Sequence, residues 1–150
     1  MAADESNDTK KILMTHALQL LGLRQQSEKE LRRKLADYAR RALPDLSESA
    51  IEPVIDRLKE QHYVDDLAFA RWYAEQRSLH RPRSKRVLRQ ELFSKGLDEE
   101  VMNTALDEYD EEAACRALAQ KRGHYPMKKL MQNLAREGFP WDIIRDVCGQ

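Results

Sequence analysis

The residues with the clearest chemistry are arginines and lysines near the middle of the chain. Between Arg77 and Lys95, seven bases stand against one acid, Glu91, which gives this segment a net charge of +6. Guanidinium and ammonium groups at this density attract phosphate oxygens or the carboxylates of an acidic protein surface. The chemistry predicted for the segment is binding, and the candidate residues are Arg77, Arg81, Arg83, Lys85, Arg86, Arg89 and Lys95.

Two other segments repeat this excess of positive charge. Residues 116–136 hold six bases and no acid, a net charge of +6, and residues 24–41 hold seven bases and three acids, a net charge of +4. Residues 98–112, by contrast, hold eight acids and no base. The alternative is an ordinary solvated surface, where acids at helix starts and bases near helix ends complement the helix dipoles. The bases added to the candidate surface are Arg32, Arg33, Lys128 and Lys129.

No catalytic or metal-binding motif stands out. The four histidines are scattered, and none has a carboxylate or thiol at the spacing of a zinc site. The sequence contains neither a P-loop nor the glycine motif of dinucleotide-binding folds. Cys115 and Cys148 make no metal or redox spacing, so reduced thiols in a cytoplasmic protein are expected. We predict a protein that is not an enzyme and needs no cofactor or metal; an enzyme would need a pocket that only the fold can assemble.

Three aromatic residues lie close together before the basic segment. Phe69, Trp72 and Tyr73 fall within about one helical turn, and such a cluster either packs in the core or stacks on nucleic-acid bases. Trp72, which follows Arg71 and precedes Gln76 by one turn, is the candidate for an exposed aromatic.

The elements that position the bases follow from a repeat of 42 residues. Residues 88–105 match residues 130–147: each apolar position falls on an apolar position, and Gly96 falls on Gly138. A period of this length is typical of stacked helical units. The alternative is a plain nine-helix globule whose similar spacings are accidental.

We predict an all-α fold of three tandem three-helix repeats, with about nine helices in an elongated, curved array. The expected parts are a disordered tail over residues 1–8 and repeats over residues 9–64, 65–109 and 110–150. Ser27 and Glu30 should form a capping box at the start of the second helix. The bases lie mainly on the second helix of each repeat, so stacking would align them. Exposed charges contribute little to stability, so replacing Arg81, Arg83 and Arg86 should leave folding intact.

Composition is consistent with a folded protein away from membranes. The chain has 150 residues, of which 41% are hydrophobic and 35% charged, with a net charge of zero. It lacks an apolar run of about 18 residues that could span a membrane. The first eight residues are polar and acidic, unlike a secretory signal. We expect a cytoplasmic monomer.

Several strings resemble the RecX family. The pattern Phe69-Ala70-x-x-Tyr73-x-x-x-Arg77, followed by Leu88-Arg89-Gln90-Glu91-Leu92-x-x-Lys95-Gly96-Leu97, looks like the central signature of that family. Residues 17–35 match its first unit, the junction Tyr63-Val64-Asp65-Asp66 matches as well, and the resemblance extends from about residue 11 to the end. One departure is Ser84, which stands where the family often has glycine; a serine there can cap the following helix.

The resemblance implies three tandem three-helix units and a cytoplasmic negative modulator of the RecA recombinase. Members of the family are not enzymes: they bind RecA, lie in the groove of its filament on DNA, and suppress its ATPase, strand exchange and coprotease activities. They thereby regulate DNA repair, homologous recombination and the SOS response. The implied partners are RecA and the RecA–DNA filament, with weak direct contact to DNA. Arg77, Arg89 and Lys95 fall on signature positions. The alternative function is a DNA-binding helical-repeat protein that acts independently of RecA.

Overall fold

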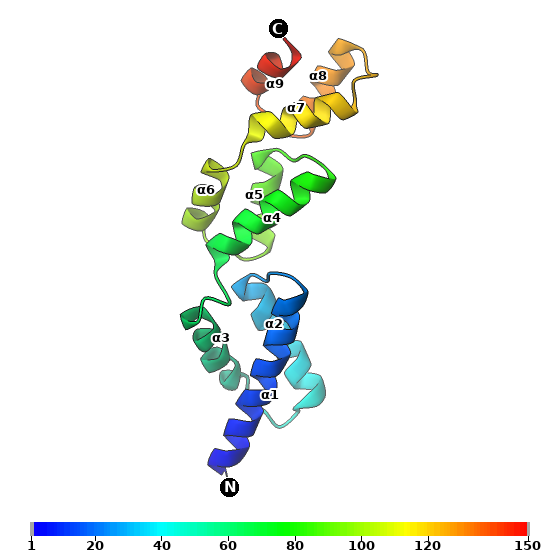
Figure 1. Cartoon of the computed structure of the whole chain (residues 1–150). Helices are drawn as coiled ribbons and strands as arrows, with labels where there is room; N and C mark the ends of the chain where they lie inside the picture. Colours follow the sequence, from blue (N-terminus) through cyan, green and yellow to red (C-terminus); the bar gives the residue numbers. More distant parts are fainter. Residues whose placement is uncertain (1, 150) are drawn as a thin grey trace. The chain divides into compact units, whose positions relative to one another are not determined.

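The computed structural model describes residues 2–149, with the side chains of residues 7–149, and every regular element in this part of the chain is helical (Figure 1). The prediction of an all-α chain with about nine helices is confirmed for these residues. A short 3-10 turn, η1 (Glu48–Ala50), precedes the third helix. The α-helices are α1 (Ala2–Leu23), α2 (Glu28–Ala42), α3 (Ile51–Glu60), α4 (Asp66–His80), α5 (Lys85–Ser94), α6 (Glu99–Asp107), α7 (Glu111–Lys121), α8 (Met127–Arg136) and α9 (Trp141–Cys148).

The chain forms two compact units. The first ends at Phe69 and also includes Lys95–Leu97, and the second comprises Ala70–Ser94 and continues from Asp98. Helix α4 therefore begins in the first unit and continues in the second. The boundary between the units divides a three-helix group. Residues 95–97 pack with the helices of the first unit rather than with α5 and α6, between which they lie in the sequence.

The core of the first unit is built from apolar residues at helical spacing. Leu13, Leu31, Leu35, Ile55 and Leu58 are fully buried, and they come from all three of its complete helices. Spacings of three and four residues place such side chains on one face of each helix, and that face turns inward.

The start of α2 contains the predicted capping box. The hydroxyl of Ser27 accepts a hydrogen bond from the Glu30 amide at 3.1 Å, and the Glu30 carboxylate accepts one from the Ser27 amide at 3.2 Å. Two amides that would otherwise lack partners are satisfied, which fixes where α2 begins.

The first helix is longer than the sequence predicted. We expected a disordered tail over residues 1–8, whereas α1 begins at Ala2. Met1 lies outside the described residues.

A left-handed residue ends α3. The Tyr63 amide donates to the Leu58 carbonyl at 2.9 Å and the His62 amide to the Lys59 carbonyl at 3.0 Å, which together form a Schellman motif. The central residue of this motif is His62, with φ at +62°, a conformation usually taken by glycine.

The second unit uses the same device with glycine at the end of α8. The Phe139 amide donates to the Leu134 carbonyl at 3.2 Å, the Gly138 amide donates to the Ala135 carbonyl at 3.0 Å, and Gly138 has φ at +103°. Phe139 and Leu134 then pack with Cys115, Leu118 and Ile144 in one apolar cluster formed by α7, α8 and α9.

None of the helices in residues 2–149 is long and apolar enough to cross a membrane.

Candidate partner-binding surface

The basic helix α5 has one buried and one exposed face. Leu88 and Leu92, four residues apart, are fully buried, which directs the opposite face to solvent. That face carries Arg86, Arg89 and Phe93, and the Phe93 side chain is 71% exposed. The arrangement offers two guanidinium groups and one aromatic ring to a partner.

Helix α8 repeats this pattern. Leu130 and Leu134 are buried, while Lys128 and Lys129 are exposed at its first turn. The Lys129 ammonium lies over the ring of Tyr125, 4.8 Å from its centroid. Both lysines therefore stand on the exposed side of α8, in agreement with the helical spacing.

Helix α2 shows the pattern with one change. Leu31 and Leu35 are fully buried and Arg33 is exposed. Arg32, however, pairs with Glu52 of α3, its Nε atom 2.6 Å from a carboxylate oxygen. This ion pair links two helices of the first unit, so Arg32 has a partner within the chain.

Two side chains of α4 and one of the loop that follows it meet at the Glu91 carboxylate of α5. The Tyr73 hydroxyl donates to it at 2.7 Å, while Arg83 and Arg77 approach within 3.1 and 3.5 Å. Burial, together with the bond to Glu91, raises the pKa of Tyr73 to about 12. The prediction that Arg83 is an exposed charge is wrong, because its side chain is only 20% exposed and pairs with Glu91.

Arg81 takes part in a junction between the second and third helix groups. It pairs with the Glu137 carboxylate at 2.5 Å, and Arg122 pairs with the same group at 3.1 Å. Burial alone would raise the pKa of Glu137, but the hydrogen bonds from the two arginines outweigh it and lower that pKa. The Ser84 hydroxyl donates to the Glu137 carbonyl at 2.9 Å and accepts from the Val87 amide at 3.2 Å.

Lys95 occupies the matching junction within the first unit. Its carbonyl accepts from the Ser27 hydroxyl at 2.8 Å, and its ammonium pairs with Glu30 at 3.2 Å. Arg24 pairs with the same carboxylate at 2.9 Å. Burial would raise the pKa of Glu30, but the hydrogen bonds from Arg24, the Ser27 amide and Lys95 lower it to about 2.

The sequence identified Ser27 and Ser84 as helix caps, but it did not show that their hydroxyls also donate to the distant carbonyls of the two junctions. The signal was present: Arg24 precedes Ser27 by three residues, as Arg81 precedes Ser84, and each serine faces a residue that directly precedes a glycine with positive φ, Gly96 or Gly138.

The candidate bases thus fall into two sets. Arg32, Arg77, Arg81, Arg83 and Lys95 are held by acidic side chains of the chain itself. The other set forms no ion pair with an acidic side chain of residues 7–149, although Arg89 donates to the amide oxygen of Asn103 at 2.7 Å. We define these six residues as the free basic set: Arg33, Lys85, Arg86, Arg89, Lys128 and Lys129.

The aromatic residue singled out from the sequence is not the most exposed one. Trp72 is only partly exposed, whereas Phe93, Tyr63 and Trp141 are 71%, 56% and 54% exposed. Helical spacing alone did not identify Phe93, because it directly follows the buried Leu92.

The described residues contain no cluster of three or more His, Cys, Asp or Glu placed to hold a metal ion.

Comparisons with known proteins agree with this architecture. The family model described as RecX, second three-helix domain, matches residues 65–106. Regulatory protein RecX of Chlorobium phaeobacteroides is 38% identical over 141 residues, which cover 89% of each chain. Regulatory protein RecX of Prosthecochloris aestuarii is 34% identical over 96% of this chain and 95% of that protein.

A solved structure shows the same fold. The crystal structure of RecX from Lactobacillus salivarius superposes with a TM-score of 0.77 at 23% identity, covering 95% of this chain and 96% of that one. The predictions of three-helix units and of a regulatory protein rather than an enzyme are confirmed by these relatives. Because the sequence identity extends over nearly the whole of both chains, this protein belongs to the RecX family of regulatory proteins.

Proposed function

We propose that this protein is a negative modulator of the RecA recombinase that binds RecA and its filaments on DNA. The observation that carries the proposal is the 38% identity to a regulatory protein RecX over 89% of both chains. The activities proposed to be inhibited are ATP hydrolysis, strand exchange and the coprotease function of RecA. The protein is proposed to act as a monomer without a cofactor.

The free basic set is proposed as the contact surface. These bases have no acidic partner within the described side chains, so an anionic partner would not have to displace one. Arg32, Arg77, Arg81, Arg83 and Lys95 instead form ion pairs with acidic side chains of the chain itself. A contact role for that second set would require these pairs to break.

The direct test measures ATP hydrolysis by RecA on single-stranded DNA. Adding the protein at a substoichiometric to equimolar ratio should inhibit hydrolysis, and the free protein should bind RecA in a pull-down without DNA. Unchanged hydrolysis at an equimolar ratio would refute the proposed function.

A charge-reversal variant tests the surface. Arg86, Lys128 and Lys129 changed together to Glu should abolish inhibition while the helical circular dichroism spectrum is retained. The matched control changes three exposed bases outside the set, Lys10, Arg57 and Arg145, to Glu. Equal loss of inhibition in both triple variants would show that only overall charge matters.

The alternative function, DNA binding without RecA, is favoured by one observation. The exposed Phe93 ring shares a helix face with Arg86 and Arg89, a combination that suits stacking on bases beside phosphate contacts. Its test is the affinity for single-stranded DNA at several salt concentrations. Each phosphate contact should contribute about −0.7 to the log–log slope, and Phe93→Ala should weaken binding more than Phe93→Tyr does. A flat salt response would exclude this alternative.

A further inference from the structure

A groove of about 560 Å3 opens on the second unit. One wall is a face of α4 whose residues are spaced by three and four, including Ala74, Glu75 and Leu79. The other wall is formed by α7, which contributes Ala113 and Ala117. Residues of α6 and of the loop after it also line the groove, between the two walls. The groove thus runs between two helices that present alanine toward each other.

Five of the residues that line the groove are alanines. Ala74, Ala105 and Ala114 are at most 8% exposed and form its floor, so the backbones of three helices lie near the surface. Leu79 lies at its edge with 68% of the residue exposed. Burying that leucine against apolar atoms of a partner would be favourable at roughly 25 cal/mol per Å2, which points to an occupant with apolar side chains.

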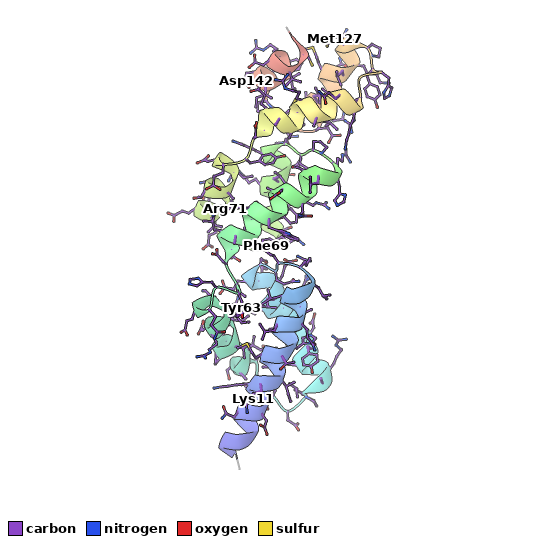
Figure 2. All side chains as sticks on the ribbon, in the orientation of Figure 1. Lys11, Tyr63, Phe69, Arg71, Met127 and Asp142 are labelled. Carbon is purple, nitrogen blue, oxygen red and sulfur yellow. The ribbon has the colours of Figure 1, made fainter. Side chains whose placement is uncertain are left out.

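The edges of the groove carry negative charge. Glu75, Glu108 and Asp110 line it, and the neighbouring residue Asp107 is an exposed acid. Arg71, which is labelled in Figure 2, also lines the groove, but both carboxylate oxygens of Glu108 accept hydrogen bonds from this guanidinium at 2.7 Å. The net charge of the edge therefore attracts bases and repels phosphate, which argues against nucleic acid as the occupant.

We propose that this groove docks a basic amphipathic helix of a protein partner. Apolar side chains at helical spacing would insert between α4 and α7 and cover Leu79, because alanine-lined walls allow a third helix to approach closely. Lysines or arginines flanking that apolar stripe would face Glu75 and Asp110. This surface is separate from the free basic set, and the proposal does not depend on the RecA proposal.

Fluorescence anisotropy with a defined peptide tests the groove. The probe is a labelled helical peptide of leucine and lysine with leucines on one face, and its control carries glutamate in place of each lysine. The lysine peptide should bind the full chain, and the glutamate peptide should bind at least about tenfold more weakly. Equal binding of the two peptides would overturn the charge assignment and with it the proposal.

Two substitutions locate the binding site. Ala113→Trp places a ring in the groove at an exposed position, and Glu75→Lys reverses the charge of an exposed edge residue. Each substitution should weaken binding of the lysine peptide by about tenfold or more. The matched controls are Gln120→Trp, also exposed on α7, and Glu100→Lys, exposed on α6, neither of which lines the groove. Controls that weaken binding as much as the groove variants, or groove variants that bind normally, would refute the proposal.

Discussion

The Ser84 hydroxyl donates a hydrogen bond to the backbone carbonyl of Glu137, 53 residues later in the chain, at 2.9 Å. Ser27 does the same to Lys95 at 2.8 Å. In both cases the serine oxygen also accepts a bond from the third amide of its own helix, so one hydroxyl caps a helix and binds a carbonyl far along the chain. The repeated sequence pattern is therefore matched by a repeated contact.

Removing this hydroxyl should lower stability. Ser84→Ala removes a cap, which costs about 0.5–2 kcal/mol, and leaves the Glu137 carbonyl without its donor, which costs about 1–3 kcal/mol if no water replaces it. We expect a total near 2–3 kcal/mol in urea unfolding. Ser94→Ala is the control, because the Ser94 residue is exposed and bonds only within its own turn, to the Glu91 carbonyl.

A second substitution separates the two roles of Ser84. Aspartate can accept the bond from the Val87 amide but cannot donate to the Glu137 carbonyl when ionised. Ser84→Asp should therefore be at least as destabilising as Ser84→Ala. Wild-type stability in Ser84→Asp would mean that only the cap matters.

Gly138 should not tolerate a side chain. A Cβ atom there would lie 2.6 Å from the Ser84 hydroxyl oxygen and 3.0 Å from Nε of Arg86, and its φ of +103° is unfavourable for other residues. Gly138→Ala should cost more than about 2 kcal/mol, since the left-handed backbone alone costs about 1–2 kcal/mol. In the control Gly22→Ala, the added Cβ would meet nothing within 4 Å, and a gain of up to about 1 kcal/mol is expected. Equal effects would contradict the close approach.

Glu30 should make stability depend on pH in the acid range. Its pKa is lowered from 4.5 to about 2, so its contribution is fully present above pH 4.5 and is lost as pH falls from 4.5 to about 2. Glu30→Gln should destabilise the protein by about 2–3 kcal/mol at pH 7, and the difference from wild type should shrink toward pH 2. Urea unfolding at several pH values measures this difference. Glu112→Gln, which breaks a half-exposed pair with Arg116, should cost less than about 1 kcal/mol; a pH-independent effect of Glu30→Gln would rule out the charge as its cause.

His62 is a site where a substitution should stabilise the protein. Its φ of +62° places a non-glycine residue in the left-handed position of the motif that ends α3. His62→Gly should raise the free energy of unfolding by about 0.5–1 kcal/mol, because glycine takes this conformation without strain. His62→Ala keeps the strain and should change stability little. A thermal melt that shows no increase for His62→Gly would indicate that the histidine side chain makes a compensating contact.

Local features of the fold could be predicted because they depend on neighbours in sequence. The capping box of Ser27 and Glu30 and the glycine ends at Gly96 and Gly138 involve residues within one or two turns of each other, and their signals are short. The buried faces of α5 and α8 likewise follow from apolar residues four apart.

The candidate site was less predictable. The sequence shows which residues are charged but not which of them form ion pairs, so Arg83 and Arg86 could not be distinguished. In the structure Arg83 is mostly buried against Glu91, while Arg86 stands on the exposed face of α5. That difference depends on how the loop after α4 packs against α5.

The family, the helical class, the repeat of 42 residues and the basic character of the second helices can be recognised in the amino-acid sequence, because motifs, composition and periodicity are properties of the chain. The folded arrangement was needed to show which bases remain free, which serines reach a distant carbonyl, and that a groove opens beside α4 and α7. Ion pairs, hydrogen bonds and cavities depend on distances between residues tens of positions apart, and folding sets those distances.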